Sequence, residues 1–402
     1  MGQTGINLDQ VKKKNRSYIL RTINDEGPIS KKDIAGKLNL TSASLTQTCA
    51  PMLEEGLIYE AGISEDSTGP GRKKVLLDIN FDYQQNYAFI IEPDKTTVAV
   101  TNLRGDLKGK RTIDTDNTVS AEKFLARISQ IALELKEKAG ITEDILLAAV
   151  CISGPVDSKR KVSLHAYGIW DEEVEIGKIL EEKLGAEVIV ENNVTAFALA
   201  EIYFGLGRKN DNLFFVKWGP GLGAAIVIDK KIYEGELKKT AEIGHFVVQR
   251  NGEKCSCGRR GCLETKLSFS AVKRDIAGVF SKEFTPKLYE LLGGDLDNLT
   301  MEFPEEYFKD LDPALTEILA KRIILFSQVI VNCMTILSPN KVVLCGPLFK
   351  NPFLREKVIE GCSYFDPYYN GENVIYTELA DKETYIGAAA LCAKKVLFGD
   401  QT

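Results

Sequence analysis

One histidine and three cysteines lie close together near the middle of the chain. His245 is followed by Cys255, Cys257 and Cys262, so one imidazole and three thiols fall within eighteen residues. Zn²⁺ prefers four nitrogen or sulfur ligands at tetrahedral corners, and the glycines inside this segment allow a tight loop around a single ion. The spacing predicts a structural Zn²⁺ site that is closed to water. A disulfide pair, or thiols with no common role, are the alternatives.

The composition is that of an ordinary globular protein. The chain has 402 residues, of which 44% are hydrophobic and 27% charged, with a net charge of −6. This length suffices for two or three domains. Most of the nine cysteines stand singly in apolar stretches, which predicts reduced thiols rather than a disulfide framework. No apolar run reaches membrane length and no secretion signal is evident, so we expect a cytoplasmic protein with no membrane partner.

Positive charge is concentrated at the amino terminus. Residues 1–37 carry eight Lys or Arg against four Asp or Glu, although the whole chain is acidic. A basic head on an acidic body is typical of a regulator that approaches nucleic-acid phosphates locally. A solvated helix face gives the same pattern.

The first 80 residues predict a winged helix-turn-helix. Apolar residues repeat at helical spacing over 7–23, and Ser30 and Thr41 can cap two further helices. Strand patterns over 57–60 and 74–79 flank a glycine-rich segment with consecutive cations, which fits a DNA-binding wing. A flexible linker between domains is the alternative for that segment.

The third helix of this head presents short polar side chains suited to base edges in a major groove. Gln47 is the best candidate for an adenine contact, Arg72 is expected to enter the minor groove, and Pro51 is expected to kink the helix. The predicted DNA-binding residues are Ser42, Ser44, Thr46, Gln47 and Arg72.

From about residue 83 onward the chain reads as strand-rich α/β. Strands are predicted over 87–91, 97–103 and 145–153, with a helix over 120–139. Farther on, the glycine-rich segment 219–223 separates two more strand patterns, and its backbone amides could cradle a phosphate or a sugar hydroxyl.

Five motifs together resemble the ROK family of repressors, open reading frames and sugar kinases. The motifs are Gly154-Pro155-Val156-Asp157, Glu191-Asn192, Gly219-x-Gly221-x-Gly223, Glu242-Ile243-Gly244-His245 and Cys257-Gly258-x-x-Gly261-Cys262-Leu263-Glu264. The resemblance covers nearly the whole chain, and the head is similar to that of the xylose-repressor branch. It implies a two-lobed actin-like (ribonuclease H-like) α/β body behind the winged helix.

The resemblance also implies domain boundaries. The head would occupy residues 1–80 and the small α/β lobe 81–190, completed by a carboxyl-terminal helix over 384–402. The large lobe would occupy 191–383 and carry the zinc loop and the dimerisation surface.

Three departures from the kinases of this family imply that the chain has no catalytic residues and is not an enzyme. Asn193 stands where the kinases carry an Asp that serves as general base, and an amide cannot accept the proton. Glu92 and Asp94 occupy the place of the first phosphate loop, where they would repel a triphosphate. Near the carboxyl end, Cys345-Gly346-Pro347 replaces a glycine pair at the adenosine site.

The residues that the resemblance assigns to sugar binding are better retained. They are Asn192, Asn193, Glu242, His245 and Glu264. Carboxylates and amides suit this task because each can bind vicinal hydroxyl groups. The alternative for Glu242 and Glu264 is that they only support the zinc loop. Residues 165–170 differ from the segment that covers the sugar in many relatives, so the identity of the sugar is left open.

These observations predict a transcriptional regulator, a repressor of carbohydrate-use genes that is released by a sugar or sugar derivative. Its partners would be double-stranded operator DNA, the sugar effector and a second copy of the chain, as a homodimer or a tetramer. One rival is a carbohydrate kinase with a fused regulatory head. Another is a constitutive DNA-binding protein whose body is a dimerisation scaffold without a ligand.

Overall fold

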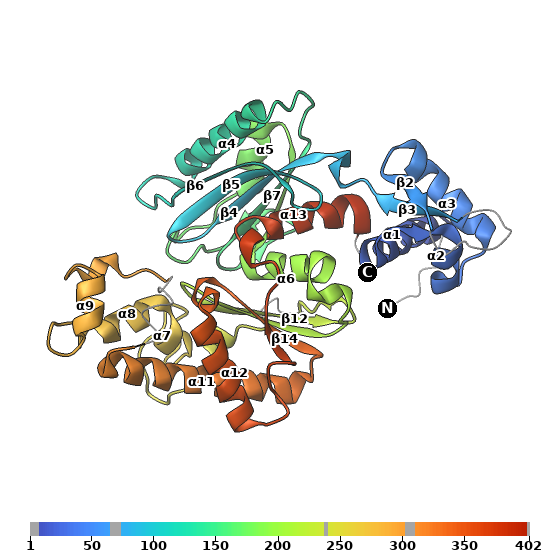
Figure 1. Cartoon of the computed structure of the whole chain (residues 1–402). Coiled ribbons are helices and arrows are strands. Elements are labelled where there is room, and N and C mark those ends of the chain that lie inside the picture. The colour runs from blue at the N-terminus through green and yellow to red at the C-terminus, as the bar shows by residue number, and fades with distance from the viewer. Residues whose placement is uncertain (1–7, 65–73, 237–239, 302–309, 400–402) are drawn as a thin grey trace. The chain divides into compact units, whose positions relative to one another are not determined.

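The chain forms two compact units. A computed structural model describes residues 8–64, 74–236, 240–301 and 310–399 (Figure 1). The first unit comprises residues 1–204 together with 384–402, and the second comprises 205–383. The described part of the segment from Thr384 onward belongs to the first unit. The chain passes from the first unit to the second at Phe204/Gly205 and returns at Glu383/Thr384, and the lobe boundaries implied by the resemblance stay predictions.

The amino-terminal head folds as three helices and a small sheet. Its elements are α1 (Leu8–Glu26), β1 (Ile29–Ser30), α2 (Lys31–Leu38), α3 (Ser42–Glu54), β2 (Ile58–Ile63) and β3 (Val75–Ile79). The three strands are antiparallel in the order β1-β3-β2. The predicted helix-turn-helix and the strands on either side of the wing segment are thus confirmed.

The predicted helix caps are present in the head. The Ser30 hydroxyl accepts from the amide of Asp33, and the Thr41 hydroxyl accepts from the amide of Ser44, so each satisfies an amide that has no partner within its own helix. Pro51 lies inside α3, and the helix continues through it to Glu54. Leu45, Cys49 and Met52 of α3 are buried in the head.

The rest of the first unit is a five-stranded sheet covered by helices. Its strands are β4 (Gln85–Ile91), β5 (Lys95–Asn102), β6 (Leu107–Asp114), β7 (Leu147–Ile152) and β10 (Glu187–Asn192), in the order β10-β7-β4-β5-β6. The helices are α4 (Ala121–Lys138), α5 (Ile176–Leu184), α6 (Asn193–Phe204) and α13 (Ile386–Ala393), and Lys394–Phe398 adds a π-helical turn. A pair of short strands, β8 (Val156–Asp157) and β9 (Val162–Ser163), lies beside them. The helices α4 and α5 lie on one face of the sheet and α13 on the other (Figure 1).

The second unit repeats this sheet topology. Its strands are β11 (Leu213–Trp218), β12 (Leu222–Ile228), β13 (Lys231–Ile232), β14 (Lys341–Cys345) and β15 (Val374–Tyr376), in the order β13-β12-β11-β14-β15. Its main helices are α7 (Glu264–Leu267), α8 (Phe269–Ala277), α9 (Pro286–Leu291), α11 (Pro313–Leu337) and α12 (Pro352–Phe365).

In each unit, three parallel strands adjoin two antiparallel ones. Polar groups at the carboxyl ends of the parallel strands are thereby brought to one edge of each sheet. The first unit carries Asn192 at such an end, and the second carries Lys217 and Cys345 near theirs. This duplicated arrangement is the one expected of the two lobes of an actin-like body.

Candidate functional site

The histidine and the three cysteines converge in the second unit. Their candidate ligand atoms all lie within 4.8 Å of one another. The distance from Cys255 Sγ to His245 Nδ1 is 3.7 Å, and that from Cys257 Sγ to Cys262 Sγ is also 3.7 Å. Two sulfurs of a tetrahedral site with Zn–S bonds of about 2.3 Å stand about 3.8 Å apart. The donor set and its spacing therefore fit one Zn²⁺, and all nine cysteines are free of disulfides.

The pKa values of two of the cysteines are shifted in opposite directions. Burial, together with the neighbouring thiols of Cys257 and Cys255, raises the pKa of Cys262 to about 12. Burial opposes ionisation of Cys257 as well, but hydrogen bonds from the backbone of Arg259 and from the other thiols outweigh it and lower the pKa of Cys257. A bound dication would offset the effect of burial and stabilise the thiolate of Cys262.

A tight turn gives the cysteine loop its shape. Gly261 has a φ of 72°, and a Cβ there would lie 1.8 Å from the carbonyl oxygen of Gln249, so only glycine fits. The amide of Gly261 donates to the carbonyl of Glu253 at 2.9 Å. The loop therefore folds back on its own start.

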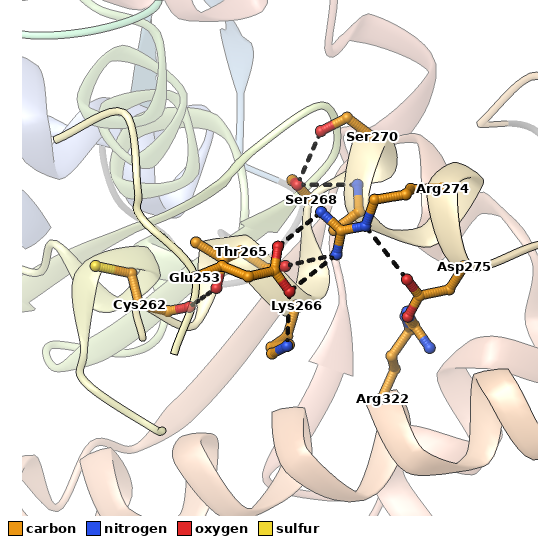
Figure 2. Close-up of polar contacts among 10 residues, drawn as sticks. Glu253, Cys262, Thr265, Lys266, Ser268, Ser270, Arg274, Asp275 and Arg322 are labelled. Atoms are coloured by element: carbon orange, nitrogen blue, oxygen red, sulfur yellow. Dashed lines mark hydrogen bonds and ion pairs between the residues drawn. The ribbon is translucent and has the colours of Figure 1, made fainter. Parts of the chain in front are cut away.

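A chain of ion pairs ties this loop to the surrounding helices (Figure 2). The carboxylate of Glu253 forms ion pairs with Lys266 Nζ at 2.9 Å and with Arg274 Nη1 at 2.8 Å. These pairs link the loop to α7 and α8. Arg274 also lies 3.4 Å from Asp275, which in turn forms a close ion pair with Arg322 of α11. The hydrogen bond from Lys266 is the main reason why the pKa of Glu253 lies below its ordinary value. Apart from the neighbours Arg274 and Asp275, these partners are 13 to 47 residues apart, so local spacing did not predict them.

Glu264 brings three of the sequence motifs together within the second unit. Its Oε2 accepts from the amide of Leu222 at 3.3 Å. A Cβ at Gly221 would lie 3.2 Å from the same oxygen, and one at Gly244 would lie 3.0 Å from it. The carboxylate thus sits against the glycine-rich loop, and that amide faces an anion of the protein itself. The loop is therefore a poorer phosphate cradle than its sequence suggested, because a phosphate there would meet Glu264.

His245 bridges the metal cluster and a carboxylate. Its Nδ1 faces Cys255, while its Nε2 lies 3.7 Å from Oε2 of Glu242. His245 is 7% exposed, and the side chain of Glu242 is 54% exposed. A carboxylate on the outer nitrogen of a metal-bound histidine fixes the orientation of the ring. The side chain of Glu242 thus lies beside His245 and remains accessible to solvent.

Asn193 lies in the first unit, and its amide is hydrogen-bonded. Its Nδ2 donates to Glu92 Oε1 at 2.9 Å and to Ser153 Oγ at 3.2 Å. An aspartate at this position would instead face the carboxylate of Glu92. Glu92 and Asn193, two of the departures noted in the sequence, are therefore linked, because the carboxylate of Glu92 accepts a hydrogen bond from the amide of Asn193.

Asn192 caps α6 rather than projecting freely. Its Oδ1 accepts from the amides of Val194 at 2.9 Å and Thr195 at 3.2 Å, and its Nδ2 donates to the carbonyl of Gly154 at 2.9 Å. Gly154 has a φ of 96°, and a Cβ there would lie 2.1 Å from the carbonyl oxygen of His165. The segment 165–170 thus rests on the same glycine that Asn192 binds. The side chain of Asn192 therefore fixes the backbone at Gly154 and at the start of α6.

The predicted DNA-binding face of α3 is accessible. Ser42, Thr46 and Gln47 are exposed and Ser44 is half-buried, whereas the opposite side of α3 packs into the head. Arg72 and the tip of the wing fall outside the described residues. In the part of the chain that the structure describes, no helix is long and apolar enough to cross a membrane.

The fold and the site define a class of protein: a winged helix-turn-helix joined to a duplicated α/β body with a His/Cys₃ loop. Residues 91–395 match the ROK family, and the chain belongs to that family.

Relatives along the whole length are named as regulators. The chain is 25% identical over 394 residues to the xylose repressor of Caldicellulosiruptor bescii, covering 96% of this chain and 97% of the relative. It is 25% identical to the DNA-binding transcriptional dual regulator NagC of Escherichia coli K12, covering 99% of this chain and 97% of NagC. A crystal structure of a ROK family transcriptional regulator, homolog of the E. coli MLC protein, has the same fold, with a TM-score of 0.79, 24% identity, and coverage of 96% and 97%.

Proposed function

We propose that this protein is a DNA-binding transcriptional regulator that represses genes of carbohydrate use until a sugar or sugar derivative binds its body. The observation that carries the proposal is the hydrogen-bonded amide at position 193, in a chain that also has an exposed reading helix. Asn193 donates to Glu92 and Ser153, so the position where the kinases hold their base has a hydrogen-bonding group but no proton acceptor of that kind. Regulators similar along the whole length support the same conclusion.

In this proposal the head reads DNA through α3. Ser42, Ser44, Thr46 and Gln47 would lie in the major groove and Arg72 in the minor groove. The exposed residues Lys12, Lys13 and Lys14 of α1 would contact phosphates. Because one helix-turn-helix reads few base pairs, the protein would act as a homodimer or tetramer on a two-fold symmetric operator.

The residues that we propose to bind the effector are those that the resemblance assigned to sugar binding: Asn192, Asn193, Glu242, His245 and Glu264. Zn²⁺ bound by His245, Cys255, Cys257 and Cys262 would be structural, because four protein ligands leave no position for water. The protein residues then recognise the effector: the loop sets the position of Glu264, and the carboxylate of Glu242 fixes the orientation of the His245 ring.

The experiment has three parts carried out on the full chain. Selection from a random duplex DNA library identifies the preferred site, and a thermal-shift panel of monosaccharides and their phosphates identifies the effector. ATP turnover is then measured with every sugar in the panel. The proposal expects a defined DNA site, at least one sugar that raises the melting temperature, and no sugar-dependent turnover. Sugar-dependent ATP consumption would favour the kinase instead, and a defined DNA site without any sugar response would favour the constitutive scaffold.

A further inference from the structure

The head provides the caps for the carboxyl end of α6. Arg21 Nη2 donates to the carbonyl of Ile202 at 3.2 Å, and Asn24 Nδ2 donates to the carbonyl of Tyr203 at 2.7 Å. Arg21 is 8% exposed and Asn24 9%, so both contacts are shielded from water. The last four carbonyls of a helix have no partner within the helix, and a cation near them is favourable. Two side chains of α1 therefore satisfy groups that α6 itself leaves open.

The same helix begins at the candidate effector residues. Asn192 caps its first turn through the amides of Val194 and Thr195, and Asn193 is its first residue. Helix α6 has 12 residues. At a rise of about 1.5 Å per residue it spans about 18 Å. One short helix thus carries the proposed effector groups at one end and the contact with the DNA-binding head at the other.

The body of α6 has little freedom to deform. Every residue from Ala196 to Tyr203 is buried. Helix α13 packs so closely on it that a Cβ at Gly387 would lie 3.1 Å from the carbonyl carbon of Ala196. Close-packed interiors transmit a displacement rather than absorb it. A displacement of the amino end of α6 would therefore also move its carboxyl end.

The end of the chain reinforces this contact. The ring of Phe398 lies 4.3 Å from that of Tyr203, and the guanidinium of Arg21 lies 4.9 Å from the centre of the Tyr203 ring. On α1, Arg16 donates to the carbonyl of Val396 at 3.3 Å, and the Ser17 hydroxyl forms a short hydrogen bond with the carbonyl of Phe398. Helix α1 thus contacts both the carboxyl end of α6 and the π-helical turn at 394–398.

We propose that α6 is the element that couples effector binding to DNA binding, with Arg21 and Asn24 as the residues through which the head senses its position. This inference rests on the proposed function, because it takes Asn192 and Asn193 as part of the effector site. A ligand that bound differently to two positions of α6 would shift the population of head orientations. The DNA-reading surface itself would need no contact with the effector.

The first test needs neither sugar nor DNA. Hydrogen exchange of the α1 amides at 19–26 is compared in the full-length wild type and in Asn193→Ala, which removes the contacts with Glu92 and Ser153. We expect exchange in α1 to become at least about threefold faster, while the β12 amides in the second unit stay unchanged. Asn193→Ser serves as the milder perturbation if the alanine variant speeds exchange everywhere. Unchanged α1 exchange, with faster exchange at the start of α6, would overturn the proposal.

A second pair of variants locates the coupling. In an Asn24→Ala background, the change at 193 should no longer alter exchange in α1. In a Thr22→Ala background it should act as in the wild type, because the Thr22 hydroxyl only donates to the carbonyl of Tyr18 within α1. Equal behaviour of the two backgrounds would overturn the role of Asn24.

Operator binding with D-xylose or N-acetylglucosamine as the probe gives the functional readout. If either sugar weakens wild-type binding, the quantity to compare is the operator affinity without sugar divided by the affinity with sugar. This ratio should fall to within about twofold of one in Asn24→Ala and stay at the wild-type value in Thr22→Ala. If neither sugar changes wild-type binding, the failure concerns the proposed effector class, and the exchange experiment still decides the role of α6.

Discussion

Replacing Asn193 by Asp tests how the first unit is built around an amide. In the wild type, Asn193 Nδ2 lies 2.9 Å from Glu92 Oε1. Asn193→Asp would place two carboxylates side by side. At about 4 Å and an effective dielectric constant of about 20 they repel each other by about 4 kcal/mol. Losing the hydrogen bond adds about 1 kcal/mol, and uptake of a shared proton relieves part of the sum. We expect a destabilisation of about 2–4 kcal/mol at pH 7.

The pH dependence follows from the same repulsion. One of the paired carboxyl groups in the variant binds its proton at a higher pH in the folded protein than in the unfolded chain. The folded variant is therefore favoured as the pH falls, and the destabilisation should shrink to about 1–2 kcal/mol at pH 5. Asn193→Ala loses the hydrogen bonds without adding a charge, so its cost should not depend on pH in this way. Glu92→Gln combined with Asn193→Asp should remove most of the repulsion.

Tryptophan fluorescence during urea unfolding is a suitable assay. The chain has two tryptophans, Trp170 in the first unit and Trp218 in the second. A Trp218→Phe background, used for every variant, leaves Trp170 as the reporter of the unit that contains Asn193. Equal stability of Asn193→Asp and Asn193→Ala at both pH values would refute the placement of the two carboxylates. Sugar-dependent ATP turnover in Asn193→Asp alone would show that the nucleotide site is intact despite Glu92 and Asp94.

Three further predictions concern the metal loop and the head. Cys257→Ser should lose bound Zn²⁺ and the response to sugar while keeping DNA binding, which metal analysis beside DNA titrations would check; a zinc-free variant that still responds would contradict it. Gln47→Ala should flatten the preference among DNA sequences, whereas Arg72→Ala should weaken binding more broadly and reduce its salt dependence. Equal loss on specific and random DNA for Gln47→Ala would remove that residue from the reading surface. Glu253→Gln should speed release of Zn²⁺ to a chelator by about 10-fold, because it weakens the ties to Lys266 and Arg274. Lys273→Ala is the matched control, because Lys273 lies on α8 beside Arg274 but pairs with Asp297 instead of Glu253. It should leave the rate of Zn²⁺ release unchanged.

Features set by short-range chemistry were predictable from the sequence. The capping hydroxyls of Ser30 and Thr41 lie three residues from the amides they bind, and the loop that gathers Cys255, Cys257 and Cys262 is short, so spacing alone identified them. The resemblance to known motifs supplied the order of the lobes. The pattern of departures at Glu92 and Asn193 was visible as two separate substitutions.

Contacts between distant segments were not predictable in this way. Asn193 and Glu92 are 101 residues apart, and nothing local shows that the carboxylate accepts from the amide. Glu264 lies 42 residues from Leu222, so its occupation of that amide was hidden behind an apparently open glycine loop. Arg21 and Asn24 read only as polar positions of a helix, because their partners are backbone carbonyls far along the chain. Such contacts depend on tertiary packing, which residue spacing does not encode.

The central claim is that sugar binding to the body changes the affinity of the head for DNA. The most direct measurement is a fluorescence-anisotropy titration of the selected operator with the full chain, at fixed salt, with and without the sugar that stabilises the protein. We expect this sugar to weaken operator binding by about 10-fold or more and to be recovered without phosphorylation. The same affinity with and without a sugar that demonstrably binds the protein would contradict it.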